Sequence, residues 1–142
     1  MANEMPSSNE FTGLSRAVIQ YSEYFTELME KRKSGEFTDD DWSSIESLVD
    51  VDNWERQGVF LDPQAEKFGW TIYKSYIERY ASGSSWEGTL RNITETPGRV
   101  ILEMEERSTR EGKTDIANTV TIYEFNESGK MRRLEVYVMP LA

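Results

Sequence analysis

Glu106 is the residue whose type and surroundings best suit chemistry. It lies in a strand-like run, residues 99–110. Every second side chain before it in this run is apolar: Val100, Leu102 and Met104. In a β-strand these residues share one face with Glu106. A carboxyl group among apolar neighbours has its charged form disfavoured, which raises its pKa. Such a group can take or give a proton near neutral pH, so Glu106 is a candidate general acid or base.

The residue types that the chain lacks limit its chemistry further. Its 142 residues include no His and no Cys, which excludes the usual general base, the commonest metal ligand and thiolate chemistry. Catalysis would use carboxylates, Arg, Lys, Tyr or amides, and we expect no cofactor and no metal. The acidic run at residues 39–41 suits the positive end of a helix better than an ion, because adjacent helical side chains point apart.

Charge and hydropathy indicate which partners are disfavoured. With 26 acidic and 16 basic residues the formal net charge is −10, so we expect no nucleic-acid partner. No segment approaches the roughly 18 apolar residues of a membrane-spanning helix. The polar residues 1–9 lack the pattern of a signal peptide. These features predict a cytoplasmic protein with no membrane partner.

One domain accounts for the length of the chain. We expect residues 1–9 to form a flexible N-terminal segment and residues 10–142 to form a single domain. No internal repeat, low-complexity tract or interdomain linker interrupts this range.

Three segments have the pattern of helices. Apolar residues recur at helical spacing over residues 11–28 and again over residues 69–81. A capping box at Ser7 and Glu10 and a stop at residues 34–35 delimit the long first helix. A shorter helix should begin after Thr38, whose hydroxyl can cap it, and should bury Trp42, Ile45 and Leu48.

Five segments have the pattern of strands. The last three alternate strictly between two faces, and turn residues separate all five. The expected strands are residues 52–61 with a bend at Gly58, then 86–94, 99–110, 114–125 and 130–139.

The lengths of the loops between strands predict which residues pair and therefore which side chains share a face of the sheet. A three-residue loop at residues 127–129, ending in a glycine suited to a left-handed conformation, pairs Val120 with Val136. A three-residue loop at residues 111–113 pairs Met104 with Val120 and places Glu106 opposite Asn118. A carboxylate and an amide would then interrupt an otherwise apolar surface, as in a ligand cavity.

The face of the preceding strand stays open. A two-residue loop at residues 97–98 would put Arg91 and Ile93 on the cavity face. An offset of one residue would instead put Leu90 and Asn92 there.

The order of elements, three helices with one intervening strand and then a long antiparallel meander, resembles the nuclear-transport-factor-2-like superfamily. This cone-shaped fold is shared by ketosteroid isomerases, SnoaL-type polyketide cyclases and limonene epoxide hydrolases. The similarity extends over about residues 11–139. It rests on Val51-Asp52-Asn53-Trp54, Glu106-Arg107, Asn118, and Gly129-Lys130-Met131 through to Tyr137.

The resemblance implies an α+β fold in which a cone-shaped, curved antiparallel sheet wraps around the long N-terminal helix, with two further shorter helices. Residues 10–142 would be one SnoaL-like domain. The chain departs from the epoxide hydrolases at Thr109 and Val136, where those enzymes have Asp, and has Met139 where many SnoaL-like proteins have Asp. Trp54 and Arg56 stand where epoxide hydrolases have an aromatic and a water-holding polar residue.

Eight residues follow as site candidates. The predicted catalytic residues are Glu106 and Asn118, whose amide could orient the carboxyl group or donate a hydrogen bond to a substrate oxygen. Alternatively, Glu106 pairs with Arg56 or lies at an exposed strand end, and the helical aromatic residues belong to the core. The predicted substrate-binding residues are Trp54, Arg56, Tyr24, Met104, Val120 and Val136.

The opposite face of the predicted sheet carries alternating charges suited to cross-strand pairs. In relatives this face commonly forms a dimer, so the resemblance implies a homodimer; a solvated face is the alternative. The residues are Glu103, Glu105, Arg107, Arg133, Glu135 and Tyr137.

Three functions are compatible with these features. The first is a cofactor-independent enzyme that isomerises, cyclises, dehydrates or hydrolyses a small apolar molecule containing oxygen, with Glu106 moving a proton. The second is a non-catalytic module that binds a hydrophobic metabolite. The third is an interaction protein that uses its sheet to dimerise.

Overall fold

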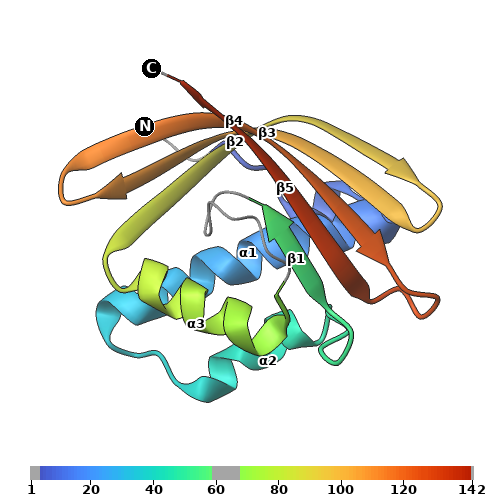
Figure 1. Ribbon diagram of the computed structural model, residues 1–142, viewed down its shortest axis with the longest axis horizontal. Helices are drawn as coiled ribbons and strands as arrows, with labels where there is room; N and C mark the ends of the chain where they lie inside the picture. Colours follow the sequence, from blue (N-terminus) through green and yellow to red (C-terminus); the bar gives the residue numbers. More distant parts are fainter. Residues whose placement is uncertain (1–3, 59–67, 142) are drawn as a thin grey trace.

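A curved sheet covers three α-helices in the computed structural model, which describes residues 4–58 and 68–141 (Figure 1). The helices lie against the concave face of the sheet, so the predicted α+β cone is confirmed. Within the described residues, no helix is both long enough and apolar enough to cross a membrane.

The helical elements lie close to the predicted ranges. The long helix and the helix after residue 69 match well, whereas the middle helix is shorter and starts as a 3₁₀ turn. The elements are α1 (Gly13–Ser34), α2 (Ser43–Glu46) and α3 (Trp70–Ala81), with 3₁₀ helices η1 (Ser8–Glu10) and η2 (Asp39–Trp42).

The five strands form one sheet in the order β1-β5-β4-β3-β2. In chain order, the third strand has the predicted bounds. The first begins at Glu55 instead of residue 52, and residues 59–61 of that prediction lie outside the described residues. The strands are β1 (Glu55–Gly58), β2 (Ser84–Thr96), β3 (Arg99–Arg110), β4 (Lys113–Phe125) and β5 (Met131–Leu141).

The prediction of a purely antiparallel sheet is corrected by β1, which runs parallel to β5. The chain leaves β1, passes through α3 and three strands, and returns in the same direction beside it. Gly58 allows the close approach: a Cβ atom there would lie 2.7 Å from the carbonyl oxygen of Val136. The sheet is therefore mixed.

The long helix α1 ends as predicted and begins differently. Gly35 adopts a left-handed conformation (φ 78°) and donates its N–H to Lys31 O, which is a glycine C-cap. The predicted capping box at Ser7 and Glu10 is present, but it caps the short helix η1. The first turn of α1 instead forms hydrogen bonds with β2.

Glu95 of β2 makes that connection. Its Oε1 accepts hydrogen bonds from the backbone N–H (2.8 Å) and the hydroxyl (2.6 Å) of Ser15. The carboxylate thus satisfies a free N–H group of the helix N-terminus and complements its positive dipole.

The segment before α1 contacts the edge strand β2. Glu4 pairs with Thr89, and its N–H donates to Gly88 O at 3.0 Å. Ser8 is buried, and its N–H donates to Glu23 of α1. The division of the chain into a flexible N-terminal segment, residues 1–9, and a single domain, residues 10–142, stays a prediction.

The predicted register between β3 and β4 is wrong by one residue. Met104 pairs with Thr119, not Val120, because the connecting turn contains two residues instead of three. Glu111 (φ 52°) and Gly112 (φ 77°) are both left-handed, as in the two-residue turns that suit hairpins. Side chains alternate along a strand, so this shift reverses the faces of β4.

The register between β4 and β5 changes within the hairpin. Near the turn the predicted three-residue loop is confirmed: Asn126 N–H donates to Lys130 O at 2.8 Å, and Phe125 pairs with Met131. A β-bulge then makes Arg132 an extra residue, so Glu124 pairs with Arg133. Beyond the bulge the predicted pairing of Val120 with Val136 is therefore wrong, and Thr121 faces Val136.

A second bulge lies in β2, and because of it each of the two predicted registers for this strand holds over part of its length. The loop at residues 97–98 has two residues, which places Ile93 opposite Leu102. The register then shifts between Leu90 and Asn92, so Leu90 pairs with Met104 on the same face. Neither alternative was complete, because each assumed an unbroken alternation.

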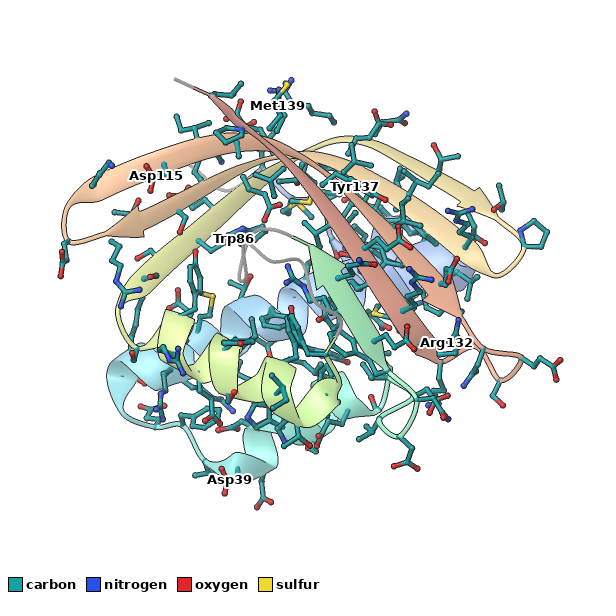
Figure 2. All side chains as sticks on the ribbon, in the orientation of Figure 1. Asp39, Trp86, Asp115, Arg132, Tyr137 and Met139 are labelled. Carbon is teal, nitrogen blue, oxygen red and sulfur yellow. The ribbon has the colours of Figure 1, made fainter. Side chains whose placement is uncertain are left out.

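The outer face carries the predicted charged side chains and an apolar strip. Arg91 of β2 donates to Glu105 of β3 at 2.8 Å, as cross-strand pairing predicts, and Arg107 donates to Glu105 at 2.9 Å from the same strand. The reversal of β4 adds apolar residues beside these charges. The exposed large apolar residues of β4 and β5 are Val120, Tyr137, Met139 and Leu141, and Figure 2 shows Met139 on the side of the sheet away from the helices.

Glu95→Ala should lower the free energy of unfolding at neutral pH by about 1 kcal/mol, as loss of a helix N-cap does. The hydrogen bonds from the Ser15 hydroxyl and then its N–H lower the pKa of Glu95. Its stabilising effect is therefore complete above the pKa of an unfolded glutamate and is lost as the pH falls through the lower folded pKa.

Urea unfolding should thus show that the free energy of unfolding differs between wild type and variant at neutral pH, and that this difference becomes smaller in acid. Glu127→Ala, at an exposed loop position, is the control and should change stability little. A difference that persisted unchanged into acid would contradict the role of the Glu95 charge.

Candidate active site

A cavity of about 150 Å³ lies between the concave face of the sheet and helices α1 and α3. Most of its wall is apolar, and aromatic rings from both layers contribute to it. Figure 2 shows Trp86 of β2 in the space between the strands and the helices. The polar groups that reach this cavity determine what it can do.

Glu106 of β3 lines the cavity, as predicted. Its Oε1 accepts a hydrogen bond from the indole N–H of Trp86 at 2.7 Å. Gly88, the partner of Glu106 on β2, makes room for this indole: a Cβ atom on Gly88 would lie 2.7 Å from a Trp86 ring carbon and 2.6 Å from Met104. The glycine therefore lets Trp86 reach across and orient the carboxylate.

Arg56 of β1 brings a positive charge to the same cavity. The residue is only 5% exposed, and its Nε and Nη1 make no hydrogen bond within the part of the chain that the structure describes. The guanidinium carbon lies 5.3 Å from the ring centre of Tyr73 and 6.0 Å from that of Phe68. Within the described residues Arg56 and Glu106 form no ion pair, so the alternative in which the two neutralise each other is wrong.

Three buried tyrosines supply hydroxyl groups to the cavity wall. The hydroxyls of Tyr21 and Tyr73 form a hydrogen bond at 3.3 Å, and Tyr123 of β4 faces the same space. Burial raises the pKa of all three phenols, and the nearby Glu106 raises that of Tyr123 further. These phenols stay protonated at neutral pH and can donate hydrogen bonds to a ligand oxygen.

Four of the eight predicted site residues line the cavity: Glu106, Arg56, Met104 and Val136. The predicted meeting of Glu106 with Asn118 is wrong, because Glu106 pairs with Ala117. Asn118 pairs with Glu105 and therefore shares the outer face of the sheet. Its side chain lies on the side opposite the cavity.

The remaining predicted residues lie outside this cavity. Val120 is on the outer face of β4 and is 36% exposed. Trp54 is buried in the core, where its ring centre is 5.1 Å from that of Trp70. Tyr24 lines a second hollow of about 520 Å³ between α1 and the N-terminal segment. Ser22 and Trp86 line both hollows and so form part of the wall between them.

Sequence reasoning missed Tyr21, Trp86, Thr121 and Tyr123 as site residues. The predicted register puts Val120 on the cavity face, so Thr121 and Tyr123, which alternate with it along the strand, fall on the outer face. A two-residue turn at residues 111–112 would have placed both on the inner face. Trp86 gave no such signal, since its contact with Glu106 depends on the pairing of two strands.

Solved structures share the fold of this chain. An NTF2-like protein of unknown function from Burkholderia pseudomallei has a TM-score of 0.69 at 12% identity, covering 91% of this chain and 92% of that one. The chain has the NTF2-like fold. This confirms the resemblance at the level of the fold.

Other NTF2-like structures carry functional descriptions. One described as a SnoaL-like polyketide cyclase from Shewanella denitrificans has a TM-score of 0.68 at 10% identity, covering 89% of this chain and 90% of that one. An LEH-like epoxide hydrolase from M. tuberculosis has a TM-score of 0.60 at 11% identity, covering 87% and 83%. No protein-family model and no curated protein matches the chain.

The polar groups of this cavity suit proton transfer. Within residues 4–58 and 68–141, no three acidic side chains gather in a way that could hold a metal ion. Glu106 can accept or donate a proton, while Arg56 and the phenols can stabilise negative charge on a ligand oxygen.

Arg56→Met should raise the free energy of unfolding of the protein by about 1 kcal/mol. Replacing buried charges by apolar side chains of similar size is often neutral or stabilising, although the two ring contacts of the guanidinium are lost. Urea unfolding measures the change. Arg16→Met, at an exposed position on α1, should change stability little, and a marked loss of stability in Arg56→Met would contradict an unpaired buried charge.

Proposed function

We propose that the protein is a cytoplasmic, cofactor-independent enzyme that moves a proton on a small, largely apolar molecule containing oxygen. Glu106 is the acid or base, and Arg56 with the buried phenols stabilises charge on the substrate oxygen. Isomerisation, cyclisation, dehydration and hydrolysis can all use an acid or base together with hydrogen-bond donors of this kind. The proposal is supported above all by one observation: a carboxylate, held by Trp86, faces an apolar cavity that also contains hydrogen-bond donors.

The charges of the cavity support this assignment. A base that removes a proton next to a carbonyl leaves negative charge on the carbonyl oxygen, and preorganised donors at that oxygen lower the barrier. Arg56 and Tyr73 are such donors. Because Arg56 is not paired with Glu106, neither group cancels the other before a substrate binds.

The comparisons support a small-molecule function without choosing the reaction. The fold occurs in proteins described as a SnoaL-like cyclase and an epoxide hydrolase, and also in a computationally designed 17-OHP binder. The last case is compatible with the alternative, a module that binds a hydrophobic ligand without converting it. Mutation of Glu106 distinguishes the two.

Glu106→Gln should reduce turnover by about 100-fold or more, because general acid–base catalysis contributes about 10²–10⁴-fold. A panel of ring-sized ketones, enones, alcohols and epoxides in D₂O, followed by NMR, reports hydrogen exchange and conversion together. Glu103→Gln is the matched control, since Glu103 lies on the same strand with its pairing partner Val120 on the outer face.

Full activity in a folded Glu106→Gln would show the assignment to be wrong. Recovery of every bound compound without exchange or conversion by the wild type would favour the binding module.

We also propose that the outer sheet face forms a homodimer. Val120 and Tyr137 pair directly across β4 and β5, and Met139 and Leu141 continue the strip. Tyr137 is 55% and Met139 58% exposed. Neighbouring exposed apolar side chains of this kind mark interaction surfaces.

Met139→Lys should shift the protein from dimer to monomer at micromolar concentration, because a lysine at the centre of an apolar interface is costly to bury. Light scattering after size-exclusion chromatography measures the mass. Ile72→Lys is the control, since Ile72 is 50% exposed but lies on α3. A wild-type monomer, or an equal effect of both variants, would contradict the proposed interface.

A further inference from the structure

The guanidinium of Arg56 is the feature of the cavity that proton transfer by Glu106 does not explain. Among the described residues, two of its nitrogens have no hydrogen-bond partner, and the residue is 5% exposed. Arginine stays charged in proteins, and an unpaired buried charge is unfavourable. A group retained at such a cost is best explained by a partner that arrives with a ligand.

The contacts that Arg56 makes within the described residues leave its Nε and Nη1 without a hydrogen bond. Tyr73 and Phe68 contact the guanidinium through their rings, at 5.3 and 6.0 Å from the ring centres. Such contacts support the cation but do not satisfy its N–H groups. A planar carboxylate accepts N–H bonds from a guanidinium, often two in parallel, and carries the opposite charge.

The size of the cavity limits the rest of the ligand. A cavity of about 150 Å³ has room for one six-membered ring, since an engineered apolar cavity of about that volume in another protein binds benzene. The ring would lie among the aromatic side chains that line the space between Arg56 and Glu106.

We propose that the cavity binds a small carboxylate with one ring, whose carboxylate group pairs with the Arg56 guanidinium. This inference rests on the proposed function for the identity of the cavity as the substrate site. It adds the class of substrate: an anion, bound at one end of the cavity, with its reacting carbon directed toward Glu106.

The positions of the phenols fit this orientation. Tyr73 and Tyr123 line the same cavity as Arg56 and Glu106. Burial raises the pKa of both phenols; the charge of Arg56 opposes this rise, and the charge of Glu106 adds to it. A ligand that spans the cavity can pair its carboxylate with Arg56 while Glu106 remains separate, held by Trp86.

The test uses benzoate and benzamide, which have similar shape but differ in charge. Isothermal titration calorimetry of the full chain should show benzoate binding at least 30-fold more tightly than benzamide, because breaking a buried charge pair costs about that much or more. Arg56→Met should abolish this preference. Arg16→Met, which removes an exposed arginine, should keep it.

Two further variants keep the test decisive. Arg56→Lys retains the charge without the paired N–H edge, so it should prefer benzoate by a smaller factor. Glu106→Gln should retain the preference, because it changes the proton-transfer residue and leaves the anion site intact.

Equal affinity for benzoate and benzamide, no benzoate binding at millimolar concentration, or an unchanged preference in Arg56→Met would overturn the inference. None of these results bears on whether Glu106 transfers a proton. Conversely, full turnover in Glu106→Gln would remove the proposed enzyme while the preference for benzoate could still stand.

Discussion

The alternation of side chains along β4 is the constraint on which the site depends. A shift of one residue in register moves every side chain of a strand to the other face of the sheet. Two local features determine the register of β4: the two-residue turn at residues 111–112 and the bulge at Arg132. Together they direct three polar-tipped side chains toward the helices, Thr119, Thr121 and Tyr123.

This register changes the chemistry of both faces. Inside, the groups that share the cavity with Glu106 are not an amide but a set of phenols and a guanidinium, all of them hydrogen-bond donors at neutral pH. Outside, the apolar residues of β4 lie next to Tyr137 and Met139. The same one-residue difference thus adds hydrogen-bond donors to the cavity on one face of the sheet. On the other face it creates an apolar strip among charged neighbours.

The surrounding core compensates for unfavourable features of the cavity. Trp54, Trp70 and Tyr73 pack with ring centres 4.6 to 5.8 Å apart, and aromatic pairs of this kind add stability beyond the area that they bury. Against this background an unpaired Arg56 can be tolerated. Sites that bind or react commonly depart from the best packing and pairing, and rely on the rest of the fold for stability.

The sequence by itself determined the α+β class, the bounds of β3, the two main helices, and Glu106 and Arg56 as cavity residues. These depend on local periodicity and short-range signals, which a chain carries in its own neighbouring residues. Only the tertiary structure decided the face of β4, the bulges and the parallel pairing of β1. It also brought Trp86 to Glu106 and left Asn118 outside, because such contacts depend on register between strands, which one extra residue at Arg132 is enough to change.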